Sequence, residues 1–252
     1  MGVVNVTPDS FSDGGRFEDA EAALAHAHSL IESGADILDV GGESSRPGAA
    51  PVSVEQELRR VLPVVRQLRD IPVSVDTRRP EVMRAVLDLG ASMINDIDAL
   101  AAPGALDAVA KSDCAVCLMH KKGEPATMQR DPHYDDVVSE VKSFLDERVK
   151  AAKGAGIEAD RIVVDPGFGF GKTVAHNLTL LKHLDAFSSL PILAGLSRKS
   201  SLQKITGRAV DDRLAGSLAL ALLALQGGAK ILRVHDVKET RDVIAVWEAF
   251  GK

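Results

Sequence analysis

Residues 72–96, PVSVDTRRPEVMRAVLDLGASMIND, contain the pattern that decides the fold. A short apolar run, Pro72 to Val75, is followed by the carboxylate of Asp76, and a helical segment beginning near Pro80 leads to a second run, Ser92 to Asn95. Short apolar runs of this kind are typical of strands that are buried on both faces. The stretch therefore predicts a strand, helix, strand unit in which the strands are parallel.

The same unit recurs along the whole chain, and no break in composition divides it. Eight repeats with short, right-handed connections predict class α/β and a (β/α)8 TIM barrel, with eight parallel strands in a single domain over 1–252 and the active site at the C-terminal face. An open doubly wound sheet would carry a Gly-rich dinucleotide turn after its first strand, and NVTPDSF is not such a turn. The predicted strands are Gly2–Val6, Ile37–Val40, Pro72–Val75, Ser92–Asn95, Ala115–Met119, Ile162–Asp165, Pro191–Gly195 and Lys230–Val234.

Amphipathic segments separate the predicted strands. Apolar residues recur every three or four positions in 53–68 and 134–153, which predicts helices there, and Ser53 with Gln56 suits a capping box. The segment 213–226 is apolar almost all round, so it should be buried on more than one side, with a second copy of the chain as one candidate cover.

Composition excludes several classes of protein. The 252 residues are 45% hydrophobic, enough for one large core, and 36 acidic against 30 basic side chains give a net charge of −6. This balance argues against nucleic-acid binding and against a polybasic membrane anchor. The sequence has neither an apolar run long enough to span a membrane nor a signal-peptide layout, so we expect a cytoplasmic protein. Cys114 and Cys117 point to opposite faces of their predicted strand, which favours two core residues over a disulfide or metal site.

Nearly every predicted strand ends in a polar side chain, and a barrel brings these ends to one mouth. Asp76, Asn95 and Asp165 would supply acceptors for a flat heterocycle with adjacent N–H donors, such as a 2-amino-pyrimidinone. The structural alternative is that Asp76 caps the helix near Pro80 and that Asp165 caps the turn that follows it.

Cations and amides near the other strand ends suggest an anion site. Asn5 offers an amide oxygen for Mg²⁺, and Arg233 beside His235 suits a phosphate or pyrophosphate. Arg198 and Lys199 follow the seventh predicted strand, where barrels often bind phosphate. The glycines of DPGFGFGK (165–172) do not have P-loop spacing; they predict a tight turn that lays Phe168 or Phe170 over the mouth. Residues 7–18 and 41–52 are predicted to be mobile loops at the same face.

Seven motifs, each at a predicted strand end, occur in the order found in one known family. They are NVTPDSFSDGG (5–15), DVGGESSRPG (39–48), SVDT (74–77), IND (94–96), DPGFGFGK (165–172), SRKS (197–200) and RVHD (233–236). On these motifs the chain resembles the dihydropteroate synthases of the pterin-binding barrel family over essentially its whole length.

The resemblance implies that (7,8-dihydropterin-6-yl)methyl diphosphate and 4-aminobenzoate condense to 7,8-dihydropteroate and diphosphate, with Mg²⁺, in a homodimeric enzyme of folate biosynthesis. It implies catalytic roles for Asp76, Asp165, Lys199, Arg233 and His235. The pterin would be held by Asp76, Asn95, Met119, Asp165 and Lys199, the diphosphate by Arg46, Arg233 and His235, and Mg²⁺ by Asn5. The 4-aminobenzoate would be held by Phe11, Ser45, Arg46, Pro47, Phe168, Lys199 and Ser200.

Some features depart from the family pattern, and two other functions remain open. Ser45 stands where threonine is commoner, and the chain starts almost at its first predicted strand, where family members usually have a preceding segment. A methyltetrahydrofolate:corrinoid methyltransferase would share the barrel and the pterin-binding acids but would not need the loop motifs or the SRK cations. A catalytically silent pterin-binding homologue would be expected to lose Asn5, Arg46, Lys199 or His235, and all four are present. Asp13 and Arg46 are expected to pair when the two loops close.

Overall fold

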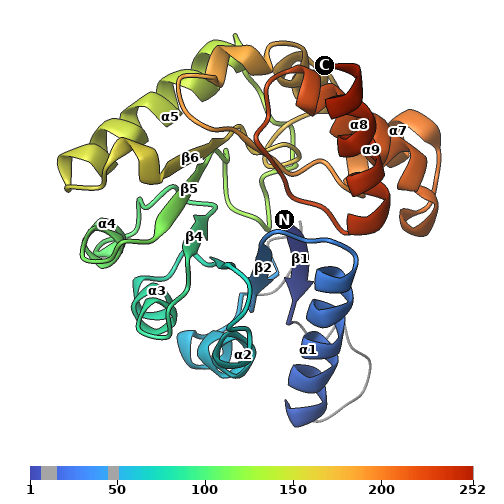
Figure 1. Cartoon of the computed structure of the whole chain (residues 1–252). Coiled ribbons are helices and arrows are strands. Elements are labelled where there is room, and N and C mark those ends of the chain that lie inside the picture. The colour runs from blue at the N-terminus through green and yellow to red at the C-terminus, as the bar shows by residue number, and fades with distance from the viewer. Residues whose placement is uncertain (7–15, 45–50, 252) are drawn as a thin grey trace.

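The computed structural model describes residues 1–6, 16–44 and 51–251, and its strands lie at the centre of a ring of helices (Figure 1). Each strand is two to five residues long. The strands are β1 (Gly2–Asn5), β2 (Leu38–Gly41), β3 (Val73–Asp76), β4 (Met93–Asp96), β5 (Ala115–Met119), β6 (Ile162–Asp165), β7 (Leu193–Ala194) and β8 (Ile231–Leu232).

The strands run parallel and follow one another around the ring. β1 to β6 form one sheet in sequence order, and β7 pairs with β8. Single bridges complete the circle, Val164 to Ile192 between the β6 and β7 regions and Gly2 to Val234 between β1 and the end of β8. The chain is a (β/α)8 barrel, as the repeat predicted. β7 and β8 are shorter than the predicted runs because ladder pairing is confined to two residues in each.

Helices cover the outside of the strands. They are α1 (Arg16–Glu32), α2 (Val54–Gln67), α3 (Pro80–Leu87), α4 (Ala105–Ala110), α5 (Val137–Gly154), α6 (Val174–Lys182), α7 (Ser200–Thr206), α8 (Leu214–Gln226) and α9 (Val237–Phe250), with short 3-10 turns at Ala159–Arg161, Leu184–Phe187 and Val210–Asp212. The predicted capping box is confirmed: Gln56 N donates to Ser53 Oγ at 3.1 Å, and Ser53 N donates to the Gln56 side chain at 3.1 Å. Within the described ranges, no helix has the length and apolar character needed to cross a membrane.

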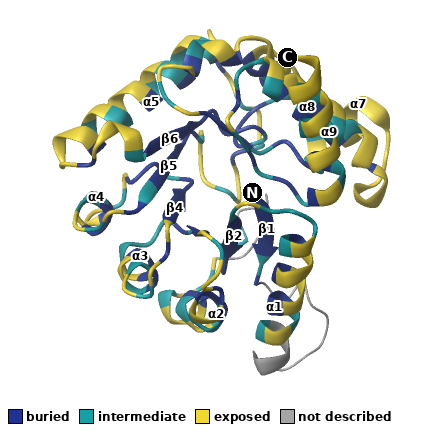
Figure 2. Cartoon of the chain, in the orientation of Figure 1, coloured by how far each residue is buried: buried dark blue, intermediate teal, exposed yellow. Residues whose placement is uncertain are grey.

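Buried residues lie along the strands, whereas exposed residues lie mostly on the helices (Figure 2). A cluster inside the barrel includes Met93, Cys117 and Leu193, and a larger core lies between the strands and the helices. Cys114 belongs to the larger core, so the two cysteines lie on opposite sides of β5, free and buried, as predicted.

The apolar helix α8 is buried on one side within this chain. Ser217, Leu220 and Ala221 are buried, whereas Leu223 is 47% exposed. The prediction that this helix is buried on more than one side is therefore not met by contacts within one chain.

Candidate active site

Polar side chains meet at the C-terminal ends of the strands. β1, β3 and β6 end in Asn5, Asp76 and Asp165, Asn95 is the next-to-last residue of β4, and Arg233 follows β8 directly. These residues end up at one mouth because every strand of a parallel barrel ends on the same side. The sequence placed them there correctly.

A guanidinium group at the centre of this mouth connects two carboxylates. Arg233 Nε donates to Asp39 Oδ2 at 2.6 Å, and Arg233 Nη2 donates to Asp76 Oδ2 at 3.0 Å. Asp39 is completely buried, and the Arg233 side chain is 19% exposed. The sequence predicted a diphosphate role for Arg233 but missed this contact, because a linear pattern does not show which strands face each other across a barrel.

The pKa values of Asp76 and Arg233 are set by burial and by the charge of the neighbouring groups. Burial raises the pKa of Asp76 to about 7 against the opposing effect of Arg233, with Asp39 adding to the rise. Burial alone would lower the pKa of Arg233, but the two carboxylates raise it instead. Arg233 is therefore cationic at all physiological pH, and Asp76 changes its charge near neutrality.

Beside this pair lie buried polar atoms that could accept hydrogen bonds. Asn95 donates through Nδ2 to Asp39 Oδ2 at 3.1 Å. Asn95 Oδ1, Asp39 Oδ1 and Ser74 Oγ are buried and have no hydrogen-bond partner in the described part of the chain. A ligand that offers N–H donors would satisfy such atoms.

The turn after β6 is held from both ends. Gly167 N donates to Asp165 Oδ1 at 2.7 Å, so Asp165 caps the turn, as the structural alternative had it, and also lies at the mouth. Gly167 has φ +70°, and a Cβ there would lie 1.8 Å from the carbonyl oxygen of His120. Burial raises the pKa of Asp165, and the Gly167 N–H counteracts the rise. Asp76, in contrast, does not cap α3, whose N-cap Arg79 has no side-chain cap.

A buried lysine fixes the rest of the same turn. Lys172 Nζ lies 2.9 Å from Gly167 O, 3.1 Å from Phe170 O and 2.9 Å from His120 Nδ1. Burial lowers the pKa of Lys172 to about 7 and the pKa of His120 to about 3, so the imidazole is neutral. Sequence reasoning gave neither residue a role.

The two phenylalanines of this turn differ in position. Phe168 is 2% exposed and packs in the main core, and its predicted place in the 4-aminobenzoate site stays a prediction. Phe170 clusters with Met119, and Lys199 Nζ lies 4.3 Å from its ring centroid. Phe170 is thus the ring that lies beside Lys199. The sequence had left open whether Phe168 or Phe170 lies over the mouth.

The remaining predicted cations are distributed differently. Arg198 pairs with Asp236 at 2.5 Å and 3.1 Å, so it is already engaged. His235 Nδ1 lies 3.1 Å from Ser197 Oγ, and burial together with Arg233 lowers the pKa of His235 to about 4. His235 is therefore neutral, although it lies near the cations Arg198 and Arg233. Ser197 was missed as its partner.

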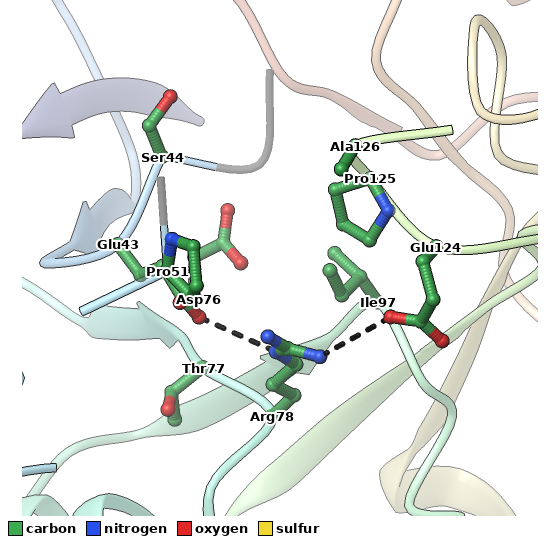
Figure 3. Close-up of a pocket in the computed structure, with 10 residues that line it drawn as sticks. All are labelled: Glu43, Ser44, Pro51, Asp76, Thr77, Arg78, Ile97, Glu124, Pro125 and Ala126. Atoms are coloured by element: carbon green, nitrogen blue, oxygen red, sulfur yellow. Dashed lines mark hydrogen bonds and ion pairs between the residues drawn. The ribbon is translucent and has the colours of Figure 1, made fainter. Parts of the chain in front are cut away.

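A cavity of about 110 Å³ opens beside Asp76 (Figure 3). Arg78 lies across it, 3.3 Å from Glu43 and 3.7 Å from Glu124, and so connects the segment after β2 with the segment after β5. Sequence reasoning gave no role to Arg78. The lining residues are Glu43, Ser44, Pro51, Asp76, Thr77, Arg78, Ile97, Glu124, Pro125 and Ala126.

Several predicted site residues lie apart from the described cluster. Phe11, Ser45, Arg46 and Pro47, and with them the expected pairing of Asp13 with Arg46, fall outside the described residues. Ser200 is the first residue of α7 and is exposed.

Asn5 is the one protein ligand predicted for Mg²⁺. It is half-buried, with its Oδ1 directed toward Gly41 at the same mouth. In the described ranges, no three His, Cys, Asp or Glu side chains are arranged to hold a metal ion. A lone amide oxygen fits Mg²⁺ that is bound largely through substrate phosphates and water, which is how this ion commonly binds.

Comparisons with known proteins agree with this geometry. A family model described as "Pterin binding enzyme" matches residues 1–235. The dihydropteroate synthase of Escherichia coli (strain K12) is 50% identical over 254 residues, covering 99% of this chain and 90% of that protein. A solved structure of Xanthomonas albilineans dihydropteroate synthase with 4-aminobenzoic acid has a TM-score of 0.94 and 56% identity, covering 100% of this chain and 92% of that chain. The same enzyme in complex with 7,8-dihydropteroate gives a TM-score of 0.90 at 53% identity, with coverage of 100% and 92%.

Proposed function

Because this chain belongs to the family of pterin binding enzymes, we propose that it is a transferase of the pterinylmethyl group. It condenses (7,8-dihydropterin-6-yl)methyl diphosphate with 4-aminobenzoate to give 7,8-dihydropteroate and diphosphate, a step of folate biosynthesis. The observation that carries this function is the set of acceptors at the mouth, Asp76, Asn95 and Asp165, with Arg233 among them.

The acceptors account for pterin binding. A 2-amino-pyrimidinone ring presents adjacent N–H donors, and one carboxylate accepts two of them in parallel. Asp76 and Asp165 provide such carboxylates, and Asn95 provides a carbonyl oxygen. Met119 and Phe170 form an apolar wall on which the flat ring can lie.

Charge at the mouth accounts for loss of the diphosphate. As the bond from the methylene carbon to oxygen breaks, the electron pair leaves with the diphosphate, and positive charge spreads from the methylene into the pterin ring. Arg233 stabilises the leaving anion, neutral His235 donates a hydrogen bond to it, and Asp76 with Asp165 stabilises the cation. The amine of 4-aminobenzoate then attacks the methylene carbon and loses a proton, so no protein nucleophile is needed.

Asn5, together with the diphosphate, would hold Mg²⁺, which would lower the charge on the leaving group. The support is the half-buried amide of Asn5 at the same mouth. The 4-aminobenzoate is placed beside Phe170 and Lys199, with Ser200 at its outer end. Phe11, Ser45, Arg46 and Pro47 are assigned to the same subsite, and Arg46 also to the diphosphate, on the resemblance alone.

The assembly is proposed to be a homodimer that forms through α8. Ala215, Ala219 and Leu223 are spaced four residues apart and are exposed, and no charged residue lies between Leu214 and Gln226. An apolar helix face of this kind is suited to a second copy of the chain. Cytoplasmic location stays a prediction.

The test is release of diphosphate from the pterin diphosphate with Mg²⁺, measured with and without 4-aminobenzoate. We expect dihydropteroate only when both substrates are present. Binding without turnover would instead indicate a silent homologue, and methyl transfer from methyltetrahydrofolate would indicate the corrinoid methyltransferase.

Two substitutions test the residues. Lys199→Ala and Asp76→Ala should each lower kcat/KM by at least about a hundredfold, because each removes a charged contact at the reacting centre. Lys111→Ala on α4, where Lys111 forms an exposed ion pair with Asp107, is the matched control and should leave kcat/KM unchanged. A near-native rate in either site variant would remove that residue from the mechanism.

A further inference from the structure

We propose that Asp39 is a positioning residue that fixes the amide of Asn95 as a hydrogen-bond acceptor, and so makes the site select a ring with an amino group over one with an oxo group. Asp39 also holds Arg233 in place when the pterin takes Asp76. The inference rests on the proposed function of the same site and adds a residue that sets its specificity.

Asp39 is suited to this role by its place in the barrel. It lies in the middle of β2, where it pairs in register with Val3 on one side and Ser74 on the other, and it is completely buried. Its Oδ2 accepts from two donors, Asn95 Nδ2 at 3.1 Å and Arg233 Nε at 2.6 Å. A buried carboxylate has no water to accept from in place of these partners, so both contacts are strongly favoured.

The contact with Asn95 decides which atom of that amide meets the ligand. An amide side chain carries one donor group and one acceptor, and its orientation is set by its neighbours. Asp39 Oδ2 accepts from Asn95 Nδ2, which leaves Oδ1 as the other polar atom of the amide. Oδ1 is buried and has no partner in the described part of the chain, and Asn95 pairs in register with Asp76. The atom of Asn95 that remains for the ligand is thus an acceptor beside an acceptor.

Acceptors in this arrangement discriminate between two related rings. A 2-amino-pyrimidinone ring has an exocyclic amino group that donates, whereas a 2,4-dioxo ring has a carbonyl oxygen in its place. The dioxo ring would bring a second acceptor against buried oxygens that have no other partner. A site built to bind a donor rejects an analogue that lacks it by several orders of magnitude, because the buried acceptor is then left unpaired.

The contact between Asp39 and Arg233 affects the binding of the diphosphate half of the substrate. Arg233 uses Nη2 for Asp76 and Nε for Asp39. A pterin that takes Asp76 displaces only the first of these contacts. The guanidinium then stays attached through Nε, and its Nη groups are available for the diphosphate.

The experiment compares affinities rather than rates. Dissociation constants are measured by calorimetry for 6-hydroxymethyl-7,8-dihydropterin and for its 2-oxo analogue, in the wild type and in Asp39→Asn. We expect the wild type to prefer the amino ring by at least about a hundredfold. Asp39→Asn should reduce this preference at least about tenfold, because the introduced amide can donate as well as accept and so lets the Asn95 amide turn over. It should also weaken the binding of inorganic diphosphate, because Arg233 loses its anchor.

A double substitution separates positioning from mere damage to the fold. In Asp39→Asn with Asn95→Asp, the new amide donates to the new carboxylate, which again presents only acceptors to the ring, so the preference should return to within about threefold of the wild type. A general packing defect would not be repaired by exchanging the two side chains. Asp107→Asn on the exposed surface of α4 is the matched control and should match the wild type.

Three results would overturn the inference: equal affinity of the wild type for the two rings, an undiminished preference in folded Asp39→Asn, or failure of the exchange to restore the preference. If Asp39→Asn does not fold, the ratio of the wild-type affinities for the two rings and the preference of the double variant still test the inference. The proposed function fails separately, when the wild type makes no dihydropteroate from the two substrates.

Discussion

Pterin affinity should depend on pH through Asp76. Burial raises the pKa of this carboxyl group to about 7, while Arg233 opposes the rise and Asp39, Glu57 and Asp96 add to it. The sign follows from the direction of this shift. Below pH 7 the group takes up a proton and can no longer accept two N–H bonds, so affinity falls as pH falls.

The magnitude follows from the fraction of ionised protein. When only the ionised form binds well, the apparent dissociation constant is the intrinsic value divided by that fraction. With a pKa of about 7, the fraction is roughly one in eleven at pH 6 and one in a hundred at pH 5. We therefore expect binding about elevenfold weaker at pH 6 than on the plateau above pH 8, and about a hundredfold weaker at pH 5.

The assay is calorimetric titration with 6-hydroxymethyl-7,8-dihydropterin, which has no phosphate to titrate, in the wild type and in Asp76→Asn. Asp165, whose pKa burial also raises, titrates in both proteins, as does the ligand, so their contributions cancel in the ratio of affinities. The ratio of wild-type to variant affinity should fall tenfold per pH unit below 7 and stay level above it. A ratio that is constant from pH 8 to pH 5 would refute the reasoning.

Other substitutions test the turn after β6. Gly167→Ala should abolish activity and soluble expression, because its Cβ would lie 1.8 Å from a main-chain oxygen. Gly156, with φ +93° and open space around it, is the control, and Gly156→Ala should cost only about 1–2 kcal/mol of unfolding free energy in urea titrations. Equal losses in the two variants would contradict the steric argument. Phe168→Ala should lower the unfolding free energy by about 3–5 kcal/mol. Phe170→Ala should mainly raise KM for 4-aminobenzoate at least tenfold, and the reverse pattern in steady-state kinetics and melting would exchange the roles of the two rings. Lys172→Met should lower the unfolding free energy by about 2 kcal/mol or more, since it removes hydrogen bonds to buried carbonyls, and an unchanged urea midpoint would show that these bonds contribute nothing.

The barrel and the composition of its mouth could be predicted because both depend on local patterns. Apolar runs locate strands, and the residue after a run lies at the strand end whatever the rest of the chain does. The capping box at Ser53 is equally local and was confirmed. The burial of Phe168 in the main core could not be predicted, for the opposite reason. It stands two residues from Phe170, with Gly169 at φ +82° between them, and in such a turn the direction of a side chain depends on backbone angles that residue spacing does not reveal.

The charge states of the site residues and the contacts across the barrel could not be predicted from the sequence either. His235 looks cationic beside Arg233 and Arg198, but burial and these same neighbours keep it neutral. The contact from Arg233 to Asp39 joins residues 194 positions apart, and only closure of the barrel brings them together. A linear pattern names the groups at a strand end, while their charges depend on depth and on neighbours across the ring.

The contacts of Arg233 across the barrel explain how several carboxylates can lie together at the mouth. Isolated buried charges are strongly destabilising, and here Arg233 forms ion pairs with both Asp39 and Asp76. Its guanidinium presents parallel N–H donors, as does the amino-pyrimidinone edge of a pterin. Binding at Asp76 therefore replaces the single Arg233 Nη2 donor with donors of the ring instead of filling an unsatisfied site. The acceptors that gain a partner outright are those near Asn95, so selectivity between rings should be controlled there rather than at the more conspicuous ion pair.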